Sequence, residues 1–193
     1  MISRRAVLEA GAVAIGGIAV GGVVLFEHAD PAVSAPSAKQ DAEILNFALL
    51  LEFIQAAFHA EALSRAKLTG DLKTFASTVA AQEQDHVAYL KQALGAAARK
   101  SPKLDFGDDT SDSDKYSLAA FKLEDLGVAA YNAQAPNLTK PSLRAAARLV
   151  SVESRHAAWI RDLRGLIPAP DAAEPSIPAQ QVVDTLKGSG YVQ

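Results

Sequence analysis

The sequence predicts an all-α protein: a four-helix bundle in which two antiparallel helical hairpins are joined by a long crossover. Three observations support this fold class. Four long segments carry apolar residues at helical spacing, and no segment shows the alternation of apolar and polar residues that is typical of a strand. A polar, acidic segment separates the four into two pairs. The chain has 193 residues, of which 49% are hydrophobic, and this is ample for the core of one domain.

The first hairpin is expected to consist of helices over residues 41–68 and 72–98. Gly70 is expected to end the first helix, because glycine readily adopts the left-handed conformation that often follows a helix. Asp71 is expected to cap the second helix with its carboxylate.

The crossover is expected over residues 99–116, where Gly107 and a run of aspartates make the chain too polar to form a packed element. Fully extended, this segment outreaches a helix of about 30 to 40 Å, so the second and third helices can run parallel. The second hairpin is expected from helices over residues 117–133 and 141–166, with Thr139 or a neighbour as the cap of the latter.

Three segments are expected in chain order. Residues 1–38 form a twin-arginine signal and linker, residues 39–167 form the bundle, and residues 168–193 form a Pro-rich tail. Within the tail, a short helix is expected over residues 178–187 and is ended by Gly188.

The N-terminal residues have the features of a twin-arginine export signal. Arg4 and Arg5 precede an apolar run, rich in Gly and Ala, over residues 10–26. An ordinary transmembrane anchor is the alternative, but this run is short and weakly apolar beside the roughly 20 residues that a span needs. Cleavage is expected within residues 33–38. We therefore expect export to the bacterial periplasm or cell envelope, with membrane anchoring only where the signal is retained.

Two motifs indicate a metal site. Glu83-x-x-His86 and Glu153-x-x-His156 each place a glutamate three residues before a histidine inside a predicted helix. At this spacing both side chains project from one helix face, so each helix offers a carboxylate and an imidazole to an ion. The chain has no cysteine, which leaves oxygen and nitrogen ligands only. Two such helices predict two ions.

A two-metal carboxylate bundle also takes one glutamate from each of the other two helices. Glu52 lies in the middle of the first predicted helix among apolar neighbours, and Glu124 lies on the apolar stripe of the third, with Asp125 to its side. Counted from the hairpin turns, the ligands of each hairpin differ in height by less than about 10 Å. The expected metal ligands are Glu52, Glu83, His86, Glu124, Glu153 and His156.

Two further residues are expected near this site. His59 shares a helix face with Glu52, and it fits a group that supports a ligand, an added ligand, or a core histidine; the first and last roles are favoured. Tyr131 lies on the stripe of Glu124, where it fits a hydrogen bond to a ligand, a radical carrier, or simple packing.

The ligand order Glu52, Glu83-x-x-His86, Glu124, Glu153-x-x-His156 resembles that of the ferritin-like superfamily, over residues 41–166. More narrowly, residues 44–52, 56–58 and 124–131 resemble exported ferritin-like domain proteins that include desiccation-related relatives in plants. The resemblance implies a di-iron or di-manganese site without implying a settled reaction. Met1 is the only methionine, so the heme-binding, iron-storing role of bacterioferritins is not supported.

The net charge excludes one class of function, and the predicted ligands favour another. A net charge of -3 and a pI near 5.8 give no basic surface for nucleic acid. Two metal ions held by these ligands predict redox chemistry with oxygen or peroxide, or oxidation of ferrous iron, in envelope stress protection. The second hypothesis is a non-catalytic structural or stress-protective bundle with a single or vestigial metal site, and the third is metal sequestration. A first helix that is apolar on nearly every face also predicts a homodimer.

Overall fold

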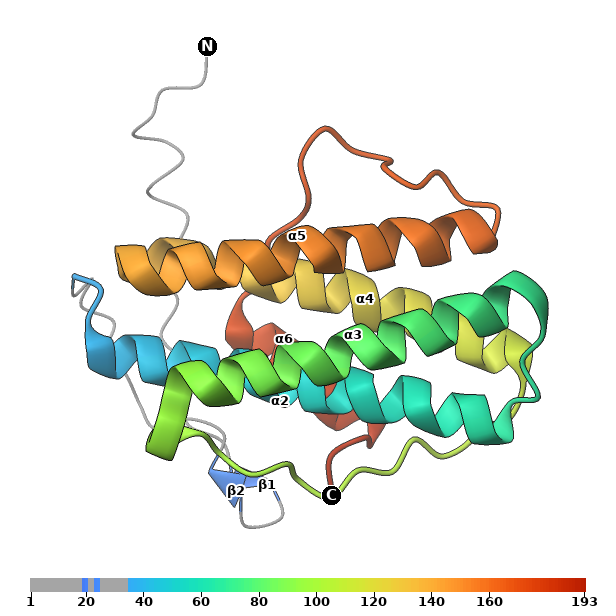
Figure 1. The fold of residues 1–193 in the computed structure, drawn as a ribbon, viewed down its shortest axis with the longest axis horizontal. Coiled ribbons are helices and arrows are strands. Elements are labelled where there is room, and N and C mark those ends of the chain that lie inside the picture. The colour runs from blue at the N-terminus through green and yellow to red at the C-terminus, as the bar shows by residue number, and fades with distance from the viewer. Residues whose placement is uncertain (1–18, 21–22, 25–34) are drawn as a thin grey trace.

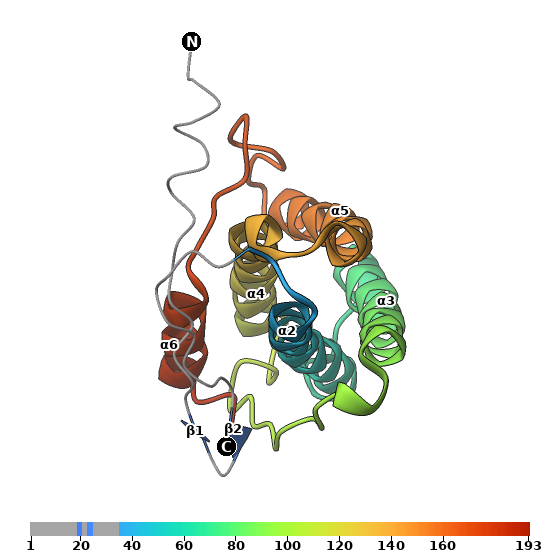
Figure 2. The same cartoon turned by 90° about the vertical axis from the view of Figure 1, so that its left-hand side faces the viewer.

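The computed structural model describes residues 19–20, 23–24 and 35–193, and it confirms an all-α bundle. The bundle helices are α2 (Ala38–Arg65), α3 (Gly70–Leu94), α4 (Ser113–Gln134) and α5 (Lys140–Leu163). Figure 2 shows them arranged around a common centre. Short 3₁₀ helices follow α3 and α4, namely η1 (Gly95–Ala97) and η2 (Ala135–Asn137). A further helix, α6 (Ala179–Ser189), lies outside the bundle beside α4.

The chain follows the predicted path of two antiparallel hairpins and a crossover (Figure 1). After η1 the chain runs along the length of the bundle before α4 begins, so α3 and α4 point in the same direction. The crossover is better packed than its polar composition predicted. Phe106 and Thr110 are buried, and Leu104 forms an isolated antiparallel bridge with Val192 near the C-terminus. Apolar side chains of the crossover thus help to close one side of the core.

The helix ends differ from the predicted ends because local hydrogen bonds decide them. The α2 helix begins at Ala38, where Ser37 accepts a hydrogen bond from the amide of Gln40, 3.3 Å away. Gly70 does not end α2; it is the first residue of α3, with a φ of 55°. Thr69 rather than Asp71 occupies the N-cap position of α3. At the C-terminus, Gly190 rather than Gly188 adopts a positive φ and ends α6.

One apolar core continues from the bundle into the tail. Val182, Val183 and Leu186 of α6 and the following Tyr191 are buried in the same cluster as Phe58 and other residues of the bundle helices. The tail is also tied to the crossover through the backbone, since the amide of Asp105 donates to the carbonyl of Tyr191 over 3.1 Å. Residues 168–173 are exposed, but α6 and the residues that follow it are packed against the bundle as part of its core.

The N-terminal predictions fall largely outside the described residues, including the Arg4–Arg5 pair and nearly all of residues 10–34. The strands β1 (Ala19–Val20) and β2 (Val23–Val24), which the sequence did not predict, pair antiparallel and contain β-branched valines that favour extended backbone. Among the described residues, α2 alone is long and apolar enough to cross a membrane. In the most apolar stretch of α2, 83% is buried inside the fold. A buried core helix passes the same test of length and composition, so α2 also fits a helix of the core.

Candidate metal centre

The six predicted ligands all come together in the middle of the bundle. Each of the four helices contributes: α2 provides Glu52, α4 provides Glu124, and α3 and α5 each provide one glutamate and one histidine. The four glutamate side chains are completely buried, and the two histidines are exposed by only 2% and 6%. The spacing of three residues in each motif places both side chains on the inward face of one helix.

One half of the cluster is centred on His86. Its Nδ1 atom lies 2.8 Å from Glu153 Oε1, 3.2 Å from Glu52 Oε2 and 3.3 Å from Glu83 Oε2. These carboxylates come from three helices, so Nδ1 of His86 is the histidine atom directed at the bundle centre.

The other half is centred on His156. Its Nδ1 atom lies 3.0 Å from Glu83 Oε1 and 3.6 Å from Glu124 Oε2. On the opposite side of the ring, Nε2 lies 2.6 Å from the side-chain oxygen of Gln82, an exposed residue of α3. An amide oxygen only accepts, so Nε2–H is the donor, and when the ring is neutral Nδ1 carries the lone pair and faces the carboxylates.

Two sets of ligand atoms are each compact enough to hold one metal ion. Within each set, the atoms lie no more than 4.8 Å from one another; the first set is Glu52, Glu83, His86 and Glu153, and the second is Glu83, Glu124, Glu153 and His156. The two sets share Glu83 and Glu153. A carboxylate has two oxygens, so the shared pair has the composition expected of bridging ligands between two ions.

The chain matches the family of ferritin-like domains over residues 40–166, which is more than half of its length. The protein belongs to the ferritin-like domain family. The matched residues span the bundle helices and contain all six converging side chains. A comparison with curated proteins found no match. The superfamily resemblance is thereby confirmed, while the narrower likeness to desiccation-related proteins stays a prediction.

Charges in this ferritin-like centre are strongly coupled. Burial raises the pKa of Glu83 well above its usual value, and repulsion from Glu153 and Glu52 adds to the effect. Burial and the charge of Glu52 likewise raise the pKa of Glu153. Burial also opposes protonation of His86, but hydrogen bonds and charges of Glu153 and Glu52 outweigh it and raise its pKa to about 10. Without a metal ion, the carboxylates of this centre are compensated by protons.

The residues of the centre fit a bound cation. Both oxygens of Glu83, one oxygen of Glu124 and Nδ1 of His156 are buried and receive no hydrogen bond from any part of the chain that the structure describes. Such buried atoms cost about 1–3 kcal/mol each when they are left without a partner. They converge from several helices, and carboxylate oxygens and imidazole nitrogens are atoms that bind divalent metal ions in proteins.

His59 contacts a ligand from the side away from the cluster. Its Nε2 atom lies 2.8 Å from Glu124 Oε1, and its Nδ1 atom lies 2.7 Å from the hydroxyl of Tyr116. A carboxylate accepts, so Nε2–H donates to Glu124 and the Tyr116 hydroxyl donates to Nδ1. All three side chains are completely buried. Burial alone would raise the pKa of Glu124, but His156 and His59 hold it well below its usual value.

Tyr131 and Gln55 hold two further ligands. The Tyr131 hydroxyl donates to Glu52 Oε1 over 2.5 Å, and the Gln55 amide nitrogen lies 3.4 Å from Glu153 Oε2. Gly127 of α4 leaves room for Gln55, because a Cβ atom there would lie only 3.3 Å from the amide nitrogen.

Gln55, Gln82 and Tyr116 contact the site although the sequence did not predict a role for them there. Gln55 had an available signal, because it lies three residues after Glu52 and therefore on the same helix face. No sequence signal pointed to Gln82 or Tyr116, because their hydrogen-bond partners lie on other helices.

Proposed function

We propose that this ferritin-like protein is an exported di-iron or di-manganese carboxylate protein with a redox role in envelope stress protection. The observation that carries the proposal is the pair of four-residue sets that share Glu83 and Glu153. In this assignment Glu52 and His86 would hold one ion, Glu124 and His156 would hold the other, and Glu83 and Glu153 would contribute to both.

Bound iron or manganese would supply electron transfer to or from oxygen or peroxide, including the oxidation of ferrous iron. The chain's own side chains fix the ligands for that task. The Tyr131 hydroxyl orients Glu52, and the Gln82 oxygen selects the His156 tautomer whose Nδ1 lone pair faces the carboxylates. The surrounding core excludes water from the cluster, which strengthens the attraction between carboxylates and a cation.

Export and assembly complete the proposal. The Arg4–Arg5 signal supports passage of the folded protein to the periplasm or envelope, with contact to the membrane only through the signal segment. A homodimer is proposed from the apolar character of α2, on which Phe53 and Ala57 stay partly exposed. Oxygen or peroxide is the proposed small-molecule partner.

A non-catalytic bundle with one metal ion or a vestigial site is the second candidate function. The complete burial of all four glutamates favours it, because a centre closed on every side holds a structural ion well. The two candidates differ in how many ions bind and in whether those ions react.

Metal content decides between them. Protein expressed with iron or manganese is analysed for metal per polypeptide, beside Glu83→Gln and the control Asp85→Asn, which changes an exposed carboxylate on the same helix. Two ions in the wild type and in the control, with loss in Glu83→Gln, support the di-metal centre. One ion, or none, in a folded wild type refutes the di-metal centre and supports the structural candidate with a single or a vestigial site.

A further inference from the structure

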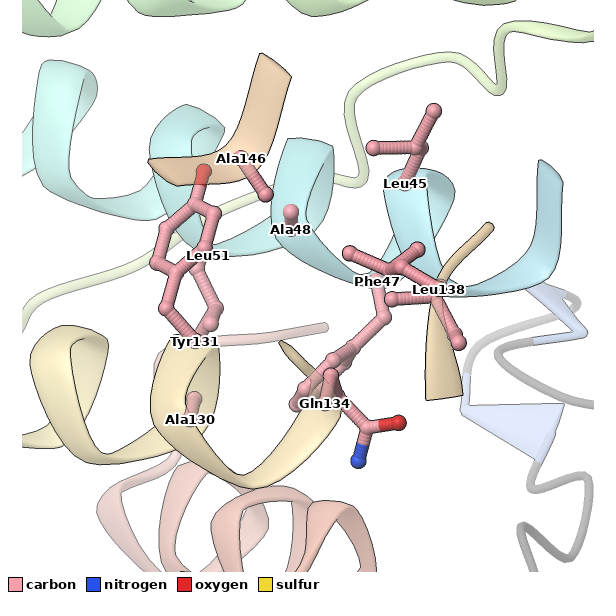
Figure 3. Close-up of a pocket in the computed structure, with 10 residues that line it drawn as sticks. Leu45, Phe47, Ala48, Leu51, Ala130, Tyr131, Gln134, Leu138 and Ala146 are labelled. Atoms are coloured by element: carbon pink, nitrogen blue, oxygen red, sulfur yellow. The ribbon is translucent and has the colours of Figure 1, made fainter. Parts of the chain in front are cut away.

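An apolar pocket lies at the end of the bundle where α2 begins. Its walls include Phe47, Ala48 and Leu51 of α2, Ala130 and Tyr131 of α4, and Ala146 of α5. Figure 3 shows Tyr131 and Leu51 at one end of the pocket, with Leu138 and Gln134 at the other. The empty space is about 300 Å³, its open mouth included.

The inner end of this pocket meets the metal centre through one side chain. The ring of Tyr131 lines the pocket, while its hydroxyl donates to Glu52 Oε1. Glu52 itself is completely buried in the cluster. A rotation of Tyr131 that breaks this one hydrogen bond would therefore join the pocket to the centre.

The walls restrict what can enter. No charged side chain lines the pocket, and apart from the Gln134 amide and the Tyr131 hydroxyl the lining is hydrocarbon. An ion that left water for these walls would lose its hydration with nothing to replace it. Hydrogen peroxide would lose hydrogen bonds for the same reason. The 300 Å³ of empty space includes open solvent at the mouth, so the part enclosed by side chains has room only for a very small guest.

We propose that this pocket binds dioxygen and admits it to the metal centre, with Tyr131 as the gate. The inference rests on the proposed di-metal function and narrows it, because it makes dioxygen rather than peroxide or an ion the molecule that arrives by this route. Metal ions then require a separate, polar route.

Xenon tests the pocket without any reaction, because it is an apolar atom that occupies dry cavities. Crystals of the wild type, Ala146→Leu and Ala147→Leu are pressurised with xenon, and its position is read from anomalous scattering. Ala146 lines the pocket, while the neighbouring Ala147 is exposed and serves as the matched control. We expect xenon in the wild type and in Ala147→Leu and its loss in Ala146→Leu. A wild-type pocket without xenon overturns the proposal, even if the Ala146→Leu variant fails to fold.

A second measurement tests delivery to the centre. Metal content is determined first, and then the reduced, iron-loaded proteins are mixed with dioxygen or with hydrogen peroxide. We expect Ala146→Leu to slow the reaction with dioxygen on the order of tenfold relative to Ala147→Leu, because entry is blocked, with the peroxide reaction unchanged. Equal slowing of both reactions, or of neither, overturns the proposal. Absence of bound metal instead refutes the di-metal function, and the xenon result still reports on the pocket separately.

Discussion

The metal centre brings four fully buried glutamates together, an arrangement that opposes folding unless a cation is present. Burial and mutual repulsion raise the pKa values of Glu83 and Glu153, so the metal-free protein carries protons where the metal ions would bind. Glu124 differs because His59 and His156 hold its pKa low. The same buried carboxylates that fit a metal ion therefore lower the stability of the metal-free protein.

Glu83→Gln is expected to stabilise the metal-free protein. The amide keeps the size of the side chain and is neutral without taking up a proton, whereas Glu83 must be protonated against its ordinary pKa to be buried. Removal of that cost should stabilise the metal-free protein at neutral pH by about 1–4 kcal/mol. Urea denaturation in the presence of a chelator measures the free energy of unfolding. Asp85→Asn should change it by less than about 0.5 kcal/mol, since Asp85 is exposed. A variant no more stable than the wild type would show that the carboxylates do not strain the fold.

Gln82→Ala is expected to weaken metal binding without touching a ligand. The Gln82 oxygen accepts the Nε2 hydrogen of His156, and loss of such a support typically costs about 10–100-fold in metal affinity. Competition with a chromophoric chelator measures the affinity, and Gln84→Ala, another exposed glutamine on α3, is the control. Unchanged affinity in Gln82→Ala would mean that other contacts fix the His156 ring.

Among the helices, the beginnings of α2 and α5 are joined by one carboxylate. Asp41 accepts hydrogen bonds from the Thr139 amide over 2.9 Å, from the Ser142 hydroxyl over 2.6 Å and from the Thr139 hydroxyl. Thr139 has the N-cap position of α5 but forms no side-chain cap of its own, so Asp41 provides the acceptor from another helix. Burial opposes the charged form, but these hydrogen bonds prevail and lower the pKa of Asp41 below 3.8.

Asp41→Asn is expected to reduce stability at neutral pH and to change its acid dependence. Because the folded pKa is lowered, the contribution of Asp41 is fully present above the unfolded value of 3.8 and is lost as the pH falls through the folded value. We expect a cost of about 1 kcal/mol at about pH 6 that shrinks toward zero in strong acid. Urea titrations across this range measure it, with Asp71→Asn at the exposed start of α3 as the control. A cost independent of pH would contradict this assignment.

Helices were predictable from the sequence where the spacing of apolar residues determines them. Features that depend on individual side-chain contacts were harder to predict. Four helices, their pairing and the crossover follow from apolar spacing and from one polar segment, and the inward position of Glu52 follows from its apolar neighbours. The start of α2 at Ala38 depends on the Ser37 cap, and the packing of Phe106 depends on contact with the distant Tyr191. The Ser37 cap is a local signal that the prediction missed, whereas the contact between Phe106 and Tyr191 leaves no local signal in the sequence.

The candidate site divides in the same way. The two side chains of a Glu-x-x-His motif lie on one face of one helix. The amino-acid sequence alone was therefore enough to pair Glu83 with His86 and Glu153 with His156. The role of Tyr116 could not be predicted, because it needs the start of α4 to lie beside His59 of α2. The convergence of side chains from one helix was predictable, whereas the groups that orient them depend on how the helices pack.

Across the whole molecule, the tail and the bundle share one core, and this joins α6 to the metal-supporting residues. Tyr191 stacks on Phe58, whose ring also stacks on Tyr116, the hydrogen-bond partner of His59. The Tyr191 hydroxyl donates to Asp109 in the crossover over 2.5 Å. Residues 168–193 should therefore unfold together with the bundle.

Leu186→Ala tests this cooperativity. Leu186 is 3% exposed within the shared core, and truncation of such a leucine costs about 2–5 kcal/mol, whereas the exposed neighbour in Lys187→Ala should cost less than about 0.5 kcal/mol. Unfolding is followed by circular dichroism, which reports all helices, and by fluorescence of Trp159, which lies on α5 in contact with Phe75. If the tail belongs to the bundle, both probes shift together in Leu186→Ala, because one transition melts the entire core. A small early transition in circular dichroism with Trp159 unchanged would instead make α6 a separate unit and leave the bundle stable without it.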